Sequence, residues 1–487
     1  MYAQTVARVR ELEKLSLAGG MPEYELMRRA GVTAAAWIDA LFPDAGRFIV
    51  LAGGGNNGGD ALVVAAHLTS APVEVFAVKP LAEYSGCAVE AAAGLPGSIP
   101  LTVKESLERG DLRPGDVIID GLLGIGFAGG KLRDNIRRSI EVVNRSRLPV
   151  VALDLPSGID GDSGLPAESG AVEADITLTF GAVKAGLLTP AGSRYRGQLR
   201  LLDIGLLPDG DGEAMVFTNI DAVETMPQSA LDCHKNSRGR VMIWGGSPEY
   251  PGAAALAAYA ALKSGAGIVR CASQADLSCR LKDSVIFHQL FTGEIPEKFM
   301  ADSDVLVCGC GWGSCAVPES LRRALVFPGV VILDADALNC AARHPQEWIE
   351  RDNLIITPHP GEAERLRVAA GLPPEKERGR LAARLAAHYG AVTVLKGRDT
   401  VVASPSGKVI TVAAGSELLA TAGSGDVLSG VIGALAAQRG MRPFDAAVSG
   451  VYIHGIAGEN FRRILSADDL PELISQTIRK IRYNRFI

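Results

Sequence analysis

The sequence predicts an α/β protein made of two doubly wound domains, and three features of the chain support this prediction. Short apolar runs typical of buried parallel strands alternate with segments of helical spacing. Most of these runs end in a loop rich in Gly, Asn or Asp, as ligand-binding loops do at the carboxyl edge of a parallel sheet. The pattern breaks at LPDGDG, residues 207–212, and starts again before residue 240. We therefore expect one domain at residues 1–215 and another at 225–487.

The composition excludes several classes of protein. The chain has 487 residues, of which 47% are hydrophobic and 21% charged, as in ordinary globular domains. A net charge of −6 implies no general affinity for nucleic acid or for an anionic membrane. The longest apolar run, Ala253–Leu262, is far shorter than the roughly 18 residues of a membrane span. We expect a cytoplasmic protein.

The eight cysteines do not form a disulfide framework or a zinc site. Cys308, Cys310 and Cys315 are close in sequence, but they lack the paired C-x₂₋₄-C spacing that zinc sites repeat at a distance. We expect them to be buried free thiols that follow a strand.

The N-terminal half begins with two helices, over Thr5–Leu17 and Tyr24–Ala36, because apolar residues recur there at helical spacing. The run Arg47–Ala52 reads as a buried strand and leads directly into GGGNNGGDALVVAAHL. A strand, a glycine-rich turn and a helix start are the parts of a dinucleotide site, although the spacing is not G-x-G-x-x-G.

Polar residues in this glycine-rich turn suit ligand binding. The amides of Asn56 and Asn57 can hydrogen-bond a carboxamide, a ribose or a phosphate. Asp60 has two interpretations from the sequence alone: it either belongs to this site or caps the helix that follows.

Two further strands of this half, residues 116–120 and 149–154, end in the acids Asp120 and Asp154. In a parallel sheet these ends line one crevice, so both acids should converge with the loop at 53–60, and the loop at 121–130 could close over a ligand. Asn57, Asp120 and Ser157 offer oxygen ligands of low total charge, which suits a monovalent cation better than zinc. Strands at 175–180 and 198–203 should complete the sheet.

The C-terminal half repeats the alternation of strands and polar loops. We expect strands at 240–244, at Ile268, and at 304–307, 330–333, 354–357 and 392–395. Loops with Gly, Asp, His or Lys follow them, at 245–252, 309–313, 334–339, 358–362 and 396–400. His359 lies between two prolines and is interpreted either as a site residue or as a solvent-exposed turn histidine.

The stretch ATAGSGDVLSG, residues 420–430, combines a turn, an anion site and a lone acid. Gly423, Ser424 and Gly425 allow backbone N–H groups to approach a phosphate, and Asp426 is expected to open a helix. A carboxylate there that points away from the phosphate suits a general base in phosphoryl transfer. The alternative is that Asp426 is a helix N-cap after a glycine turn.

These motifs together resemble a known family. The N-terminal GGGNNGGD, VIIDGLLGIGFAGG and VALDLPSGIDGDSG resemble the epimerase domain of the bifunctional NAD(P)H-hydrate repair enzymes. The C-terminal YPGAA, GCGWG, DADALN, TPHPGE, KGRDT and TAGSGDVLSG resemble their ADP- or ATP-dependent dehydratase. The resemblance implies a Rossmann-like three-layer sandwich followed by a ribokinase-like doubly wound domain.

The resemblance also implies the two reactions. The first domain would interconvert the (R) and (S) forms of hydrated NADH and NADPH, with Asp154 as the acid/base. The second would remove water from the (S) form at the expense of ADP or ATP, through a phosphorylated intermediate. Asp426 would be its base, while Lys396, backbone N–H groups and Mg²⁺ offset phosphate charge.

Further residues follow from the match. Epimerase hydrate-binding positions are Asn56, Asn57, Gly58, Gly59, Asp60, Gly124, Ile125, Gly126, Phe127, Ala128, Gly129, Gly130 and Asp154, and the K⁺ ligands are Asn57, Asp120 and Ser157. Dehydratase hydrate-binding positions are Ala253, Gly311, His359 and Asp426. Nucleotide-binding positions are Lys396, Gly397, Arg398, Asp399, Thr400, Glu417, Leu418, Leu419, Ala420, Thr421, Ala422, Gly423, Ser424 and Gly425.

The chain departs from the family at a few positions. Gly54 and Ala61 stand where Pro and Gly are usual, and Cys310 and Trp312 replace a common Pro and Leu. The expected partners are NADHX, NADPHX and ADP or ATP, with no nucleic acid and no membrane, and a homo-oligomer is expected. The competing hypothesis is a ribokinase-like small-molecule kinase with a fused NAD-sensing regulatory domain.

Overall fold

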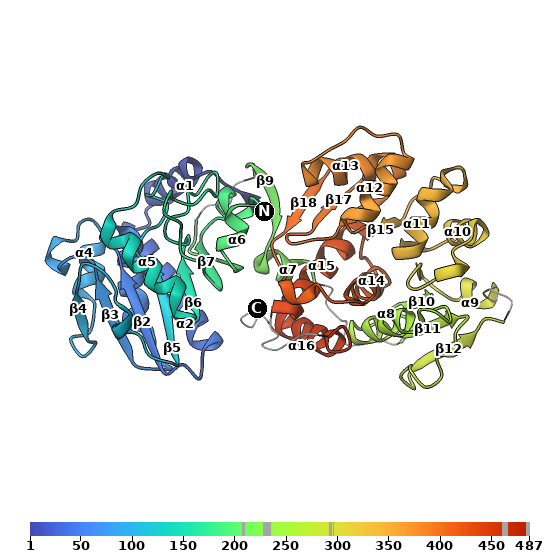
Figure 1. The fold of residues 1–487 in the computed structure, drawn as a ribbon, viewed down its shortest axis with the longest axis horizontal. Helices are drawn as coiled ribbons and strands as arrows, with labels where there is room; N and C mark the ends of the chain where they lie inside the picture. Colours follow the sequence, from blue (N-terminus) through green and yellow to red (C-terminus); the bar gives the residue numbers. More distant parts are fainter. Residues whose placement is uncertain (207–209, 227–234, 292–294, 296, 460–465, 484–487) are drawn as a thin grey trace. The chain divides into compact units, whose positions relative to one another are not determined.

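The computed structural model describes residues 1–206, 210–226, 235–291, 295, 297–459 and 466–483. The chain forms two compact units, Met1–Val216 and a second that begins at Phe217 (Figure 1). Leu207 and Cys233, which delimit the predicted domain boundary, lie outside the described residues. No helix in the part of the chain that the structure describes has the length and apolar character needed to cross a bilayer.

The first unit is built on a parallel sheet of order β4-β3-β2-β5-β6-β7-β8. Its strands are β2 (Arg47–Ala52), β3 (Val73–Ala77), β4 (Leu101–Val103), β5 (Asp116–Gly121), β6 (Val150–Leu153), β7 (Ile176–Phe180) and β8 (Gln198–Leu202). The strands predicted near residues 47, 116, 149, 175 and 198 are confirmed, whereas the sequence analysis missed β3 and β4. A short antiparallel pair, β1 (Tyr2–Ala3) with β9 (Ala214–Phe217), is also present.

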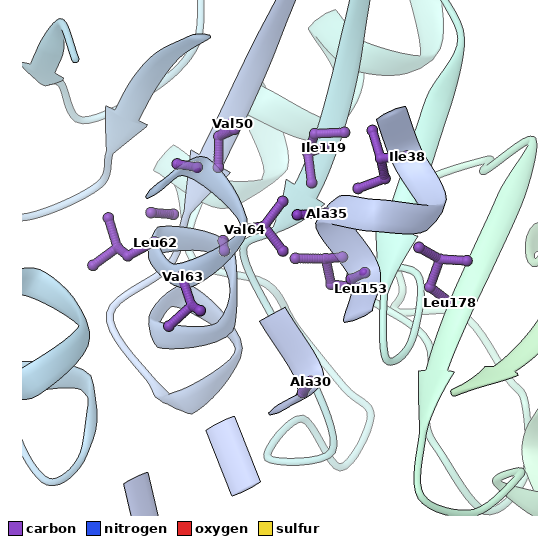
Figure 2. Close-up of a cluster of buried hydrophobic side chains, with 14 of the residues drawn as sticks. Ala30, Ala35, Ile38, Val50, Leu62, Val63, Val64, Ile119, Leu153 and Leu178 are labelled. Atoms are coloured by element: carbon purple, nitrogen blue, oxygen red, sulfur yellow. The ribbon is translucent and has the colours of Figure 1, made fainter. Parts of the chain in front are cut away.

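Helices cover both faces of this sheet. They are α1 (Val6–Ala18), α2 (Glu23–Leu41), α3 (Asn56–His67), α4 (Ala88–Ala93), α5 (Asp134–Ser146) and α6 (Gly192–Tyr195). Figure 2 shows how α2 and α3 pack on one face: Ile38 and Val64 lie with the strand residues Val50, Ile119 and Leu153 in a single core. A second core lies on the opposite face, where α5 packs on β2 and β5. The predicted three-layer sandwich is therefore confirmed.

The connectivity of this sheet creates a crevice. The chain runs outward from β2 to β3 and β4, then returns to the other side of β2 to form β5. The loops that follow β2 and β5 consequently turn away from each other at the carboxyl edge, and open α/β sheets bind ligands at this point. The predicted glycine-rich turn and the residues after Asp120 are these two loops.

The second unit repeats the design in a longer sheet, of order β18-β17-β16-β15-β14-β13-β10-β11-β12. Its strands are β10 (Arg240–Trp244), β11 (Ile268–Ser273), β12 (Val285–Gln289), β13 (Val305–Cys308), β14 (Val330–Leu333), β15 (Leu354–Ile356), β16 (Val392–Leu395), β17 (Val401–Ala403) and β18 (Val409–Val412). The strands β10 to β16 all pair in parallel. The strands β17 and β18 are antiparallel, β17 to β16 and β18 to β17. The switch point lies between β10 and β13.

The helices of the second unit again flank the sheet. They are α7 (Asn219–Thr225), α8 (Pro251–Lys263), α9 (Glu297–Ala301), α10 (Pro318–Leu325), α11 (Ala335–Arg343), α12 (Pro360–Ala369), α13 (Arg378–Tyr389), α14 (Ser424–Ala436), α15 (Pro443–Glu459) and α16 (Leu470–Arg482). One core packs α10, α11, α12 and α13 on the sheet. The prediction of a second doubly wound domain is confirmed, and the hairpin of β17 and β18 is an addition to it.

Candidate active sites

The crevice of the first unit is a cavity of about 1020 Å³. It lies at the switch point, and its wall includes the loops after β2 and β5 together with parts of α1, α2 and α3. The predicted site residues that line it are Asn56, Asn57, Asp60, Gly124, Ile125, Gly126, Phe127 and Asp154. This volume falls at the upper end of the usual range for small-molecule and cofactor sites.

The other predicted glycines of this site lie elsewhere. Gly58 is buried in the first turn of α3, where a Cβ would come within 1.8 Å of the carbonyl oxygen of Gly53. Gly59 packs against Met27. Both residues therefore let α3 approach the turn closely. Gly129 and Gly130, beyond Ala128, adopt φ of 81° and 89° in the loop between β5 and α5.

Asp154 stands directly after β6 in a strained conformation, with φ of 66°. Non-glycine residues seldom adopt this region, and such strain is concentrated at functional sites. The backbone holds the residue there, because its N–H donates to the carbonyl of Leu178 at 2.8 Å. Its Oδ1 accepts a hydrogen bond from the Phe180 N–H at 3.3 Å.

Lys184 lines this cavity, and the sequence analysis did not assign it to a site. Its side chain is buried, and its ammonium forms an ion pair with Asp154 while also donating to the Phe180 carbonyl at 2.9 Å. A buried lysine costs several kcal/mol unless it is paired in this way. The signal in the sequence was a lone lysine in the apolar stretch that follows β7, but only the fold brings it to Asp154.

Asp60 lines the cavity from within α3 and does not cap it. The helix begins at Asn56 with Gly55 as its N-cap, so the capping interpretation of Asp60 is wrong. Burial raises the pKa of Asp60 well above its usual value, and the nearby carboxylates of Asp154 and Glu13 raise it further. Glu13, on α1, and Glu23, on α2, are acids that also line this cavity and that the sequence analysis did not assign to it.

The three residues predicted to hold a cation meet around Leu123. The Asn57 side-chain N–H₂ donates to the carbonyls of Leu123 at 2.8 Å and Leu153 at 3.0 Å, which leaves its buried Oδ1 without a partner. Asp120 accepts from the Ser157 hydroxyl at 2.6 Å and the Ser157 N–H at 2.8 Å. The Ser157 hydroxyl also lies 3.3 Å from the Leu123 carbonyl.

This arrangement fits a monovalent cation. Asp120 is fully buried, and burial raises its pKa to about 6, so the carboxylate form needs a compensating positive charge. An unpartnered amide oxygen, a buried carboxylate and main-chain carbonyls are oxygen ligands with a single formal charge. The thiolates and imidazoles that zinc prefers are absent from this predicted set.

In the second unit, the predicted phosphate turn precedes α14. Gly423 is the N-cap with φ of 91°, and a Cβ there would lie 2.6 Å from a methyl carbon of Leu256. The helix therefore begins at Ser424, earlier than predicted, and Asp426 is in its first turn. The capping interpretation of Asp426 is wrong. Burial raises the pKa of Asp426 to about 6, and the nearby Asp334 carboxylate adds to this effect.

Lys396 reaches the start of the same helix. Its ammonium lies 2.7 Å from Oδ1 of Asp334, and a Cβ on Gly425 would be 3.2 Å from that ammonium. A cation beside the positive end of a helix is unfavourable unless an anion joins it. The start of α14 is therefore suited to binding a polyphosphate, with backbone N–H groups and the Lys396 ammonium as hydrogen-bond donors.

Asp334 organises this region, although the sequence analysis assigned it no role. It follows β14, is buried, and accepts a hydrogen bond from the Ser429 hydroxyl on α14 at 2.7 Å. Burial lowers the pKa of Lys396, but the carboxylates of Asp334 and Glu362 outweigh that effect and raise it. The sequence did contain a signal for Asp334. It stands at the end of a strand, as Asp120 and Asp154 do in the first unit.

Cys310, Asp334 and Asp426 have ligand atoms within 4.8 Å of one another, yet they do not fit a resident metal ion. Both oxygens of Asp334 already accept hydrogen bonds, from Lys396 and Ser429. Burial raises the pKa of the Cys310 thiol well above its usual value, so it stays protonated and hydrogen-bonds to Asp426. The prediction of buried free thiols is confirmed for Cys308 and Cys310, whereas the Cys315 side chain lies outside the described residues.

Two of the predicted hydrate-binding residues of this unit, Ala253 and Gly311, lie side by side. A Cβ on Gly311, which has φ of 65°, would lie 2.9 Å from the Cβ of Ala253. Gly311 follows Cys310, whose thiol contacts Asp426. These residues flank the β10 and β13 switch point, where a ligand crevice is expected.

His359 is the N-cap of α12 and not a simple turn residue. Its Nδ1 accepts the Gly361 N–H at 3.0 Å, and Glu362 accepts the His359 N–H at 2.9 Å. Burial and Lys396 lower the pKa of His359, so the ring is neutral. Its side chain is 51% exposed, which leaves it accessible to a ligand. Burial raises the pKa of Glu362 to about 7.

Two contacts fix the predicted nucleotide loops. The Arg378 guanidinium donates to the Arg398 carbonyl at 2.6 Å and the Leu395 carbonyl at 3.0 Å, which holds the segment from Lys396 to Thr400. In the segment Glu417 to Gly425, the buried His454 ring lies 3.0 Å from the Ser424 carbonyl. Lys396 is the residue that links the first loop to the second.

Comparisons with known proteins match two separate segments of the chain to two family models. Residues 23–186 match the family model of the YjeF-related protein N-terminus, and residues 241–480 match that of NAD(P)H-hydrate dehydratase. The chain is 35% identical to the bifunctional NAD(P)H-hydrate repair enzyme Nnr of Coxiella burnetii, over 96% of this chain and 97% of that protein. The Nnr of Escherichia coli is 36% identical over 90% of this chain and 85% of its own.

The solved structures support the fold of the second unit. A ribokinase-like superfamily protein from Enterococcus faecalis matches with a TM-score of 0.50 at 22% identity, over 56% of this chain and 99% of that one. At this identity the likeness concerns the fold alone, and it confirms the ribokinase-like architecture that the sequence predicts.

Proposed function

We propose a division of catalytic roles from the premise that this chain belongs to the family of bifunctional NAD(P)H-hydrate repair enzymes, to which its relatives at 35% and 36% identity belong. The enzyme restores hydrated NADH and NADPH to NADH and NADPH. The first unit epimerises the (R) and (S) hydrates, and the second dehydrates the (S)-hydrate at the expense of ADP or ATP. We assign the epimerase to residues 1–215 and the dehydratase to residues 225–487.

The observation that carries the epimerase assignment is the strained Asp154 paired with buried Lys184 inside a cavity of about 1020 Å³. The hydrate bears its hydroxyl on a carbon next to the ring nitrogen. The C–O bond can therefore break to give a nitrogen-stabilised cation, and water can return to either face. Asp154 is the acid/base, because it lies where the loops of both predicted hydrate-binding segments meet.

K⁺ is the cation that we propose for the site of Asn57, Asp120 and Ser157. The support is the unpartnered Asn57 Oδ1 and the buried Asp120 carboxyl. When bound, K⁺ supplies fixed positive charge that stabilises the carboxylate form of Asp120. The residues themselves hold the loop after β5 against the start of α3, since Asn57 and Ser157 both contact Leu123.

In the dehydratase, we propose that Asp426 takes the proton of the hydrate hydroxyl while that oxygen attacks the terminal phosphorus of ADP or ATP. The phosphorylated hydroxyl then leaves as phosphate, and the ring cation loses a proton from the adjacent carbon to give NAD(P)H. Lys396 and the N–H groups at the start of α14 bind the phosphates. Mg²⁺ would arrive with the nucleotide and neutralise phosphate charge, as the protein cluster around Asp334 does not hold it alone.

The substrate-binding roles of Ala253, Gly311 and His359 are supported by two relationships. Gly311 lies beside Ala253 and follows Cys310, whose thiol contacts Asp426. His359 is near enough to Lys396 and Asp334 for their charges to affect its pKa. The neutral His359 ring can hydrogen-bond a carboxamide or ribose hydroxyl. The family membership favours this two-enzyme account over a kinase with an NAD-sensing domain, and the charged cavity of the first unit supports it. Free cysteines and a cofactor-derived substrate support a cytoplasmic location. A homo-oligomer stays a prediction.

The test is to incubate the purified protein with acid-generated NADH hydrate and follow the return of dihydronicotinamide absorbance. With ADP or ATP the full pool of both epimers should be consumed. Without nucleotide, absorbance should stay flat while the epimers still equilibrate. A nucleotide-dependent reaction that leaves the (R) form untouched would contradict the epimerase assignment, and the kinase alternative would then gain support.

A further inference from the structure

The cavity of the first unit holds more titratable groups than one acid/base needs. Four carboxyl groups come from separate elements: Glu13 on α1, Glu23 on α2, Asp60 on α3 and Asp154 after β6. One buried ammonium, that of Lys184, lies among them. Carboxylates crowded around one buried ammonium repel each other in a site of low dielectric, which favours the protonated form of a carboxyl that no cation holds.

Asp60 and Asp154 have opposite surroundings. Asp154 is held by the Lys184 ammonium and by the Phe180 N–H, two donors that require an acceptor oxygen. Among the described residues, no donor hydrogen-bonds to the Asp60 carboxyl, although it faces the same cavity. A carboxyl without donors is stabilised in its protonated form, whereas one that accepts from an ammonium is stabilised as the anion.

The groups that face Asp60 reinforce this contrast. Asp154 and Glu13 repel its negative form, and Lys184 attracts it more weakly than burial opposes it, so the pKa of Asp60 stays well above its usual value. Cys87, which precedes α4, is a neutral thiol because burial raises its pKa to about 11. Pairs of carboxyl groups that the environment drives into different protonation states are typical of acid and base partners in catalysis.

We propose that Asp60 is the acid that protonates the departing hydroxyl of the hydrate, while Asp154 is the base that takes a proton from the incoming water. This inference rests on the proposed epimerase function of the cavity. The C–O bond breaks with its electron pair moving to oxygen, and the Asp60 proton completes a water molecule. The ring is left as the nitrogen-stabilised cation.

Water then attacks the other face of that cation, and its surplus proton passes to Asp154. The net change is inversion at one carbon, with one proton lost from Asp60 and one gained by Asp154. The two carboxyls now hold the protonation states that the reverse epimerisation requires. Exchange of a proton through the open cavity restores the resting state. Two carboxyls thus allow the site to act on both epimers, because one can donate a proton on one face of the ring while the other accepts a proton on the opposite face.

The experiment follows epimerisation by chromatography that resolves the (R) and (S) forms, with the spontaneous rate subtracted at each pH. An acid must be protonated to act, so the rate of the unchanged enzyme should fall as pH rises through the pKa of Asp60. Asp60→Asn should lower kcat at pH 7 by about 10²-fold or more and remove this fall at high pH, with a smaller change in KM. Asp60→Glu should restore part of the rate and the fall.

Glu13→Gln is the matched comparison, since it neutralises another carboxyl of the same cavity and should retain the fall in rate at high pH. A wild-type rate and pH profile in Asp60→Asn would overturn the proposal, as would loss of that fall in Glu13→Gln alone. If thermal melting showed that Asp60→Asn is unfolded, the epimerisation rate and the pH profile of Asp60→Ser would be measured in its place. Failure of the unchanged enzyme to epimerise would instead refute the proposed function itself.

Discussion

Lys396 and Asp334 form an ion pair of 2.7 Å at the start of α14, although 62 residues separate them in the chain. The pair sets the Lys396 ammonium beside Gly425, where the N–H groups of the helix also point. It therefore combines the two kinds of donor that a polyphosphate needs. Asp334 also accepts from Ser429, so one carboxylate fixes both the loop and the helix.

Lys396→Ala should weaken nucleotide binding, because a phosphate loses its charged donor at this place. We expect the nucleotide concentration at half-maximal dehydration to rise by about 10-fold or more, as hydrogen bonds to charged groups contribute about 1.5–3 kcal/mol. Titration of ADP and of ATP in the dehydration assay measures this. Lys408→Ala is the matched control, since Lys408 packs over the Phe444 ring in the same unit. An unchanged nucleotide requirement in Lys396→Ala would place the phosphates elsewhere.

Asp120→Ala should slow epimerisation and abolish its response to K⁺. The substitution removes the only carboxylate of the proposed cation site and the acceptor of two Ser157 hydrogen bonds. Epimerisation rates in K⁺ and in rigorously K⁺-free buffer, at equal ionic strength, are compared for both proteins. Equal rates of the unchanged enzyme in the two buffers would remove K⁺ from the account.

The pH dependence of dehydration follows from Asp426. Burial raises the pKa of this carboxyl to about 6, and a base must be ionised to take a proton. The kcat/KM for the (S)-hydrate should therefore be highest above pH 6 and fall about tenfold per unit below it. The (S)-hydrate is supplied in excess of its spontaneous loss at each pH. A rate that stayed constant from pH 7 to pH 5 would show that Asp426 is not the base.

Lys184→Met should separate a positioning role from simple packing. Methionine fills much of the same volume but cannot pair with Asp154, so we expect epimerisation to fall by about 10- to 100-fold and its pH profile to shift. Dehydration of the (S)-hydrate should be unchanged. If epimerisation kept its rate and pH profile while only the melting temperature fell, the ion pair would be purely structural.

Much of the fold was predictable because its strands are local apolar runs. Arg47–Ala52 and Arg240–Trp244 are strands β2 and β10, with the bounds read from the sequence. The edge strand β4, Leu101–Val103, was missed because it is short and partly exposed, so it lacks the apolar signal. The β17 and β18 hairpin was missed as well, since these strands have only 3 and 4 residues and give a weak periodic signal.

The sites were predictable only in part. Asp154 follows a strand and Asp426 follows a glycine-rich turn, so local sequence patterns pointed to both residues. Lys184 and Asp334 carry no such motif, and their roles depend on partners 30 and 62 residues away. Asp60 and Asp426 were each open to a capping interpretation, because the sequence does not fix the first residue of a helix.

The central claim is that one chain holds two independent sites, and the most direct test is a paired measurement on Asp154→Asn and Asp426→Asn. Each substitution keeps the size of the side chain but removes its ability to take a proton, which typically costs about 10²- to 10⁴-fold in rate. Chromatography that resolves both epimers over time is applied to each variant with and without ADP.

Asp426→Asn should fail to dehydrate the (S)-hydrate and still equilibrate (R) with (S). Asp154→Asn should consume (S) at the normal rate with ADP and leave (R) to drain only at its spontaneous rate. Loss of both activities in either folded variant would contradict the account of two separate sites.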